Sequence, residues 1–113
     1  MENFPGYKSF FEWIKYLQLC LYGNIIKQGW LYKLGNVNKS WKRGYFVLNK
    51  YQQLKYYEDS ERVKYLKMVD CKEILSVDNG KKSYDDHPYI MELTTKQRVW
   101  IIAAECDNDR VNF

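Results

Sequence analysis

The spacing of apolar residues changes near residue 25, and this change limits the folds open to the chain. Before it, Phe10, Ile14, Leu17 and Leu21 recur at i, i+4, i+7 and i+11, which predicts an amphipathic helix over residues 7–22. After it, apolar and polar residues alternate with a period of two, which is typical of half-buried strands. The sequence therefore predicts a mainly β domain that follows one helix.

Short alternating segments separated by turn residues predict seven strands. They cover residues 26–34, 41–49, 54–57, 65–69, 73–77, 89–94 and 98–104. Short connections join the first three in a meander, and the last two are expected to form a closing hairpin. Residues 70–72 are uncertain between two strands, and residues 78–88 are expected to form a loop.

The chain has 113 residues, which is enough for one hydrophobic core. The three cysteines, Cys20, Cys71 and Cys106, lie far apart with no C-x-x-C spacing. We interpret them as reduced, buried thiols of a cytosolic protein. The apolar run over residues 10–22 is interrupted by charged and amide side chains, so neither a secretion signal nor a membrane span is expected.

Positive charge is concentrated in the first strands. Residues 25–57 contain seven Lys or Arg and no Asp or Glu. Residues 1–57 hold nine basic against two acidic side chains, whereas residues 58–113 hold nine against twelve, so the two parts carry +7 and −3. Such an asymmetry orients a protein towards an anionic membrane, although an unevenly charged solvated surface is the alternative.

Three blocks of sequence resemble a pleckstrin-homology (PH) domain: Lys27–Lys33 (KQGWLYK), Ser40–Leu48 (SWKRGYFVL) and Leu54–Tyr57 (LKYY), followed by residues 89–93 and 100–105. The resemblance covers residues 25–113 and leaves residues 1–24 as an N-terminal helical extension. It implies a seven-stranded, bent antiparallel sandwich or partly open barrel with a C-terminal helix over one corner. Here that helix would begin near Arg110 and be truncated, so we expect either a fragment or spliced product, or substitution by helix 7–22.

Many PH domains bind phosphoinositide head groups at the open end between the first strands, and the resemblance implies the same site here. Strand alternation gives an independent reason. If Leu31 faces the core then Lys33 does too, and an inward Phe46 carries Lys42 with it. In the same way an inward Leu54 carries Tyr56, and Lys39 lies in the adjoining loop. We therefore predict a pit for phosphate formed by Lys33, Lys42 and Tyr56, with Lys39 above it.

One departure from the family pattern affects this site. Phosphoinositide-binding members look like Trp-Lys-x-Arg where this chain has Trp41-Lys42-Arg43-Gly44, so the inward guanidinium is absent. Arg43 alternates to the opposite face, where it could serve an outer phosphate site. We expect weak, charge-driven lipid binding. A large gain in affinity on Gly44→Arg would locate the pit and explain this weakness.

No catalytic, metal or cofactor constellation is recognisable. His87 is the single histidine, and the Gly-rich and nucleophile motifs are absent. Basic strands with aromatic residues also occur in nucleic-acid-binding sheets, but the acidic second half disfavours that class. The leading hypothesis is a cytoplasmic, peripherally membrane-associated module that binds anionic or phosphoinositide lipids and localises a signalling adaptor or a GTPase or kinase regulator. The alternative is a protein-interaction domain of the same fold that holds a peptide or small GTPase at a sheet edge or through helix 7–22.

Overall fold

A computed structural model describes residues 5–35, 39–62, 64–80 and 89–104. The predicted helix and seven strands are confirmed; the strand boundaries differ by at most two residues, and the helix ends three residues early, where a 3-10 turn continues it. The elements are α1 (Pro5–Leu19), the 3-10 helix η1 (Cys20–Tyr22), β1 (Lys27–Leu34), β2 (Trp41–Leu48), β3 (Gln53–Tyr57), β4 (Tyr65–Asp70), the 3-10 helix η2 (Cys71–Glu73), β5 (Ile74–Asn79), β6 (Ile90–Thr95) and β7 (Val99–Ala104).

Two segments differ from their prediction. Asp78 and Asn79 continue β5 instead of opening a loop, because the chain stays paired with β6 as far as Asn79 opposite Met91. The uncertain segment 70–72 ends β4 and starts η2, where the Asp70 carboxylate accepts a hydrogen bond of 2.9 Å from the Lys72 backbone N–H. The rest of the predicted loop, and the predicted C-terminal turn, lie outside the described residues.

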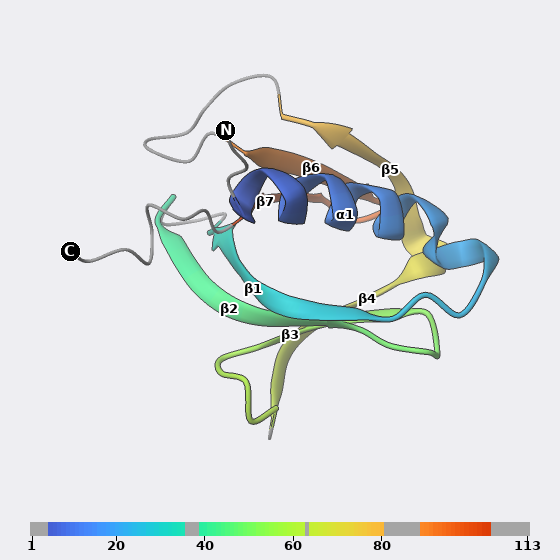
Figure 1. The fold of residues 1–113 in the computed structure, drawn as a ribbon, viewed down its shortest axis with the longest axis horizontal. Coiled ribbons are helices and arrows are strands. Elements are labelled where there is room, and N and C mark those ends of the chain that lie inside the picture. Colours follow the sequence, from blue (N-terminus) through green and yellow to red (C-terminus); the bar gives the residue numbers. More distant parts are fainter. Residues whose placement is uncertain (1–4, 36–38, 63, 81–88, 105–113) are drawn as a thin grey trace.

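The strands form one bent antiparallel sheet in the order β4-β3-β2-β1-β7-β6-β5 (Figure 1). Alternation sends every second side chain inward: in β2, Gly44, Phe46 and Leu48 are buried. Cross-strand partners share a face, so Phe46 and its partner Tyr56 both contribute to the core. The same alternation places polar residues on the inner face where the strands end.

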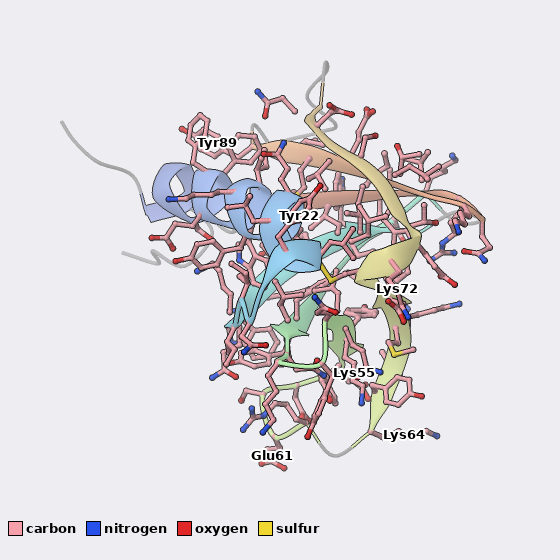
Figure 2. The ribbon with its side chains drawn as sticks, turned by 90° about the vertical axis from the view of Figure 1, so that its right-hand side faces the viewer. Tyr22, Lys55, Glu61, Lys64, Lys72 and Tyr89 are labelled. Atoms are coloured by element: carbon pink, nitrogen blue, oxygen red, sulfur yellow. A yellow bond between two sulfur atoms is a disulfide. The ribbon has the colours of Figure 1, made fainter. Side chains whose placement is uncertain are left out.

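Helix α1 is part of the core, as expected for a helix that packs on its own domain. Trp13 and Leu17 are 1% and 2% exposed, and the helix contacts β5, β6 and β7. The ring centres of Phe10 and Tyr89 are 5.8 Å apart, and Tyr89 lies beside the first turns of the helix (Figure 2). Leu21 was expected on the same buried stripe but is exposed, because the tighter winding of η1 changes the angular spacing of its side chains.

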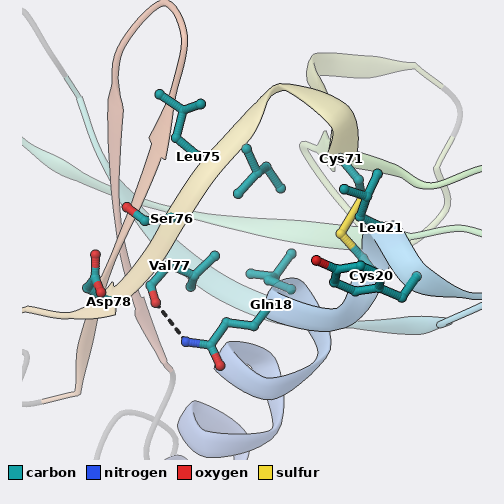
Figure 3. A pocket seen from close by; sticks show the side chains of 11 residues that line it. Gln18, Cys20, Leu21, Cys71, Leu75, Ser76, Val77 and Asp78 are labelled. Atoms are coloured by element: carbon teal, nitrogen blue, oxygen red, sulfur yellow. Dashed lines mark hydrogen bonds between the residues drawn. A yellow bond between two sulfur atoms is a disulfide. The ribbon is translucent and has the colours of Figure 1, made fainter.

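Three interactions fasten the end of the helix to the sheet. The Gln18 side-chain amide donates to the Val77 carbonyl at 2.8 Å (Figure 3), and the Gln52 amide donates to the Leu21 carbonyl at 2.9 Å. Cys20 and Cys71 form a disulfide, so the interpretation of these two residues as reduced thiols is wrong. They are 51 residues apart in sequence, yet the fold brings their Cα atoms to 6.3 Å, within the usual disulfide range. Cys106 lies outside the described residues.

Candidate functional site

Three connections leave the sheet at the same end: β1–β2, β3–β4 and β6–β7. This follows from antiparallel pairing, since β1 runs towards this end and both β2 and β7 run away from it. A backbone hydrogen bond of 3.0 Å from Gly35 N–H to the Ser40 carbonyl closes the β1–β2 connection. Cationic side chains of the first two strands reach the inner face of the sheet at this open end.

Lys33 and Lys42 are direct cross-strand partners in the β1–β2 pair. They share the inner face with Leu31, which is 1% exposed, and with Gly44, so the prediction that both lysines project to one side is confirmed. Side chains of such partners begin about 5 Å apart, and like charges directly opposite one another are unfavourable. Two lysines in register on one face leave a local excess of positive charge, which a bound anion would offset.

Lys33 is the more enclosed of the two lysines. Its ammonium group lies 4.9 Å from the centre of the Trp100 ring, and Trp100 is itself buried. Burial lowers the pKa of Lys33 from 10.5 to about 8, with the charges of Arg98 and Lys67 adding to the effect. The ammonium therefore sits where the protein disfavours positive charge, and a bound anion would relieve that cost.

The ring of Tyr56 occupies the space beside Gly44, where the inward guanidinium is absent. A Cβ atom added to Gly44 would come within 1.8 Å of Cε1 of the Tyr56 ring. The ring also packs 4.9 Å from Phe46, and Tyr56 is 8% exposed. Burial, followed by the charge of Glu58, raises the pKa of the Tyr56 hydroxyl. An arginine at position 44 must therefore first displace this ring, so Gly44→Arg does more than add a donor.

Arg43 lies on the opposite face of the sheet from Lys33 and Lys42, and Lys39 lies in the adjoining connection. Lys39 is exposed in the β1–β2 connection with φ of 56°, a left-handed conformation. Arg43 is on the outer face, as alternation predicted, with its guanidinium carbon 4.1 Å from the centre of the Trp30 ring. Trp30 in turn meets Tyr45 edge to face at 5.2 Å. Lys33 and Lys42 are thus brought together, whereas Arg43 belongs to a separate surface.

Two cations beside Lys33 were not predicted as site residues. Lys67 on β4 is opposite Tyr56, so it shares the inner face, and a parity argument from Val69 would have found it. Arg98 lies in the β6–β7 turn, where its guanidinium carbon is 4.5 Å from the centre of the Trp100 ring. No sequence signal placed Arg98 next to Lys33, because their proximity depends on how β7 pairs with β1.

A second hollow of about 320 Å³ lies between the end of α1, η1 and β5 (Figure 3). Its lining includes Leu17, Leu75, Asp78 and the disulfide. It does not adjoin the lysines of the open end. Over the ranges described, no cluster of His, Cys, Asp and Glu could hold a metal ion, and none of the helices there is both long and apolar enough to cross a bilayer.

Comparison with known proteins identifies the family that shares this architecture. The family model described as "PH domain" matches residues 25–113. The carboxyl-terminal PH domain of pleckstrin is 26% identical with a TM-score of 0.62, over 78% of this chain and 87% of that one. The same pleckstrin domain in complex with D-myo-Ins(1,2,3,5,6)P5 is 24% identical with a TM-score of 0.58, over 79% and 88%.

A chain in the crystal structure of SifA and SKIP is 20% identical with a TM-score of 0.59, over 74% of this chain and 84% of that one. No curated protein matches. The family match spans more than half of the chain, and the bent seven-stranded sheet agrees with it. This chain therefore belongs to the PH domain family.

Proposed function

We propose that this PH domain binds the anionic phosphate groups of membrane lipids, phosphoinositides among them, through Lys33 and Lys42. Tyr56 adds a hydroxyl to this pit, Lys39 adds charge from the β1–β2 connection, and Arg43 adds charge from the opposite face of the sheet. Binding would hold a signalling adaptor or a GTPase or kinase regulator at the cytoplasmic face of a membrane. The module itself performs no catalysis.

The observation that carries the proposal is the register of Lys33 opposite Lys42 on the inner face of the open end. The lowered pKa of Lys33 supports it, because the pit disfavours cations that lack an anionic partner. The pleckstrin domain of similar fold has been crystallised with an inositol pentakisphosphate, which supports the choice of ligand class.

Binding is expected to be weak and dependent on salt. The ring of Tyr56 occupies the space above Gly44, where an arginine side chain would otherwise stand. The cations of the pit are therefore lysines, which bind phosphate as point charges and not through a bidentate fork. Each basic group near an anionic membrane contributes about 1 kcal/mol, and salt screens the attraction over about 10 Å.

The test is flotation with vesicles that contain phosphatidylserine, with or without phosphatidylinositol 4,5-bisphosphate. The variant Lys33→Glu with Lys42→Glu should lose binding, and the wild type should lose it steeply between low and high salt. The matched control is Lys50→Glu with Lys55→Glu, which changes the net charge equally. Lys50 lies in the β2–β3 turn at the other end of the sheet, and Lys55 stacks on Tyr65 at 4.8 Å.

The control should retain most of the binding. Equal losses in both double variants, or binding that salt leaves unchanged, would refute the proposed pit. A chain that ignores vesicles yet binds a purified small GTPase would favour the protein-interaction alternative.

A further inference from the structure

A covalent bond joins the segment before residue 25 to the sheet. Cys20 lies in η1, ahead of the residues that match the PH domain family, and Cys71 lies in η2 between β4 and β5. Figure 2 shows this disulfide where the end of the helix meets η2. The oxidation state of the cysteine pair therefore decides whether η1 and η2 are held together covalently.

A hollow in the surface gives access to the bond. Cys20 and Cys71 are 2% and 1% exposed, so they are shielded from most of the bulk solvent. Both nevertheless line the hollow of about 320 Å³ between α1, η1 and β5, and Leu21 lies beside the disulfide there (Figure 3). Thiol–disulfide exchange requires a thiolate to approach one of the two sulfur atoms, and its rate depends on access. The hollow provides this approach without unfolding of the core.

Gln52 holds the same two segments together independently of the disulfide. Its backbone carbonyl accepts a hydrogen bond of 2.9 Å from the Cys71 N–H. Its side-chain amide donates to the Cys20 carbonyl at 3.2 Å and to the Leu21 carbonyl at 2.9 Å. Because one residue contacts the backbone of both cysteines, reduction should leave the two thiols near each other. The bond can then form again, as reversible regulation requires.

The end of the helix is the part of α1 that loses most when the bond is broken. In η1, Leu21 and Tyr22 are 45% and 81% exposed, so they contribute little packing. The Gln18 amide still donates to the Val77 carbonyl at 2.8 Å, and Gln52 still contacts η1. Segments with few buried contacts open locally at a small cost in free energy. Reduction should therefore let η1 and the last turn of α1 open more often, while the rest of the domain stays folded.

We propose that Cys20 and Cys71 form a reversible redox switch, which sets how tightly η1 and the end of α1 are attached to the sheet. A thiolate of a dithiol reductant attacks one sulfur, the S–S bond breaks, a mixed disulfide forms, and the other cysteine leaves as a thiolate. The second thiolate of the reductant then displaces the remaining cysteine. The dithiol becomes a disulfide, and its two electrons and two protons end on the cysteine pair. Oxidised glutathione reverses the reaction. The switch does not depend on lipid binding.

The rate of reduction tests the access that the switch needs. The chain with Cys106→Ser retains two cysteines, so alkylation and mass spectrometry report this pair alone. We expect the reduction rate of the folded chain to rise in proportion to the dithiothreitol concentration. A rate that stays at the rate of global unfolding, whatever the concentration, would overturn the proposal, because the bond would then be reached only in the unfolded chain.

A pair of leucine variants tests the route through the hollow. Leu21→Ala should speed reduction about three- to tenfold, because it widens the approach to the sulfur atoms. The matched control is Leu19→Ala, since Leu19 is 42% exposed, much like Leu21 at 45%, but is not part of the lining. Equal acceleration by the two variants would count against the hollow as the route. The dependence on dithiothreitol concentration, measured in both, separates wider access from lost stability.

Hydrogen exchange tests whether the bond controls the helix end. Reduction should speed amide exchange over residues 18–22 about tenfold or more, while the β6 amides stay protected, and oxidised glutathione should restore the slow exchange. Cys20→Ser should match the reduced chain and ignore reductant. Gln52→Ala should speed exchange further in the reduced chain but little in the oxidised one, because the disulfide still holds η1 there. Exchange over residues 18–22 that ignores reduction, or thiols that do not rejoin, would refute the switch.

Discussion

Lys33 is the residue at which the stability of the fold opposes the proposed binding of an anion. Its folded pKa of about 8 lies below its ordinary value of 10.5, so the folded state releases a proton that the unfolded state keeps between those values. The free energy of unfolding therefore rises as pH increases through this window, and at pH 7 the folded domain carries the cost of this half-buried charge.

Lys33→Met should raise the free energy of unfolding at pH 7 and abolish the extra stability that the wild type gains between pH 7 and 9.5. Methionine keeps the apolar stem over Trp100 but brings no charge into the pit. Urea denaturation at both pH values measures the two effects, and vesicle binding should fall in the same variant. Lys42→Met is the control, since Lys42 is exposed. A wild type and a Lys33→Met variant of equal stability at both pH values would contradict the cost assigned to Lys33.

Single residues were predictable only where strand periodicity decided them. Alternation correctly predicted Lys33 and Lys42 on one face and Arg43 on the other, because the period of two is visible in the order of apolar and polar residues. The filling of the space at Gly44 by Tyr56 was not predictable, since it depends on the side-chain packing of two neighbouring strands. The same holds for Arg98, whose place follows from long-range strand pairing.

At the level of elements, the helix and all seven strands could be predicted, because each has a clear period and turn residues at its ends. The sequence did not decide whether α1 packs on its own domain or binds a membrane or a partner protein. Its buried Trp13 and Leu17 join the core cluster of the sheet, so the helix packs on the domain that the PH match covers. The Cys20–Cys71 link was missed because no local spacing marks a pair 51 residues apart.

Reduction of the Cys20–Cys71 disulfide should lower the free energy of unfolding by about 2–4 kcal/mol, since it frees a long loop in the unfolded chain. Guanidinium denaturation with and without reductant measures the difference. Cys71→Ala should reproduce most of it and become insensitive to reductant, whereas Cys106→Ala should remain sensitive. The Gln18 and Gln52 hydrogen bonds still fasten α1, so vesicle binding should survive reduction. A chain whose stability ignores reductant would contradict the linkage.

The whole molecule carries its charge asymmetrically, and this was visible in the sequence as +7 and −3 in the two parts. The fold does not keep the two parts separate, because Lys67 and Arg98 of the acidic second part lie close to Lys33 at the open end. The strand topology therefore determines where positive charge gathers on the surface, more than the position of each residue in the chain does. A membrane would meet the basic end formed by the β1–β2 and β6–β7 connections, where long-range attraction orients the approach.

If orientation matters, the place of an added charge should matter more than net charge. Glu58 follows β3 and influences Tyr56, whereas Asp78 is exposed on β5 towards the other end of the sheet. Glu58→Lys should tighten binding to phosphatidylserine vesicles about tenfold, since it changes the charge by two near the surface, while Asp78→Lys should do much less. Co-sedimentation at two salt concentrations separates the cases: the Glu58→Lys gain should shrink at high salt. Equal gains from both variants would mean that net charge alone drives binding and that the domain has no preferred approach.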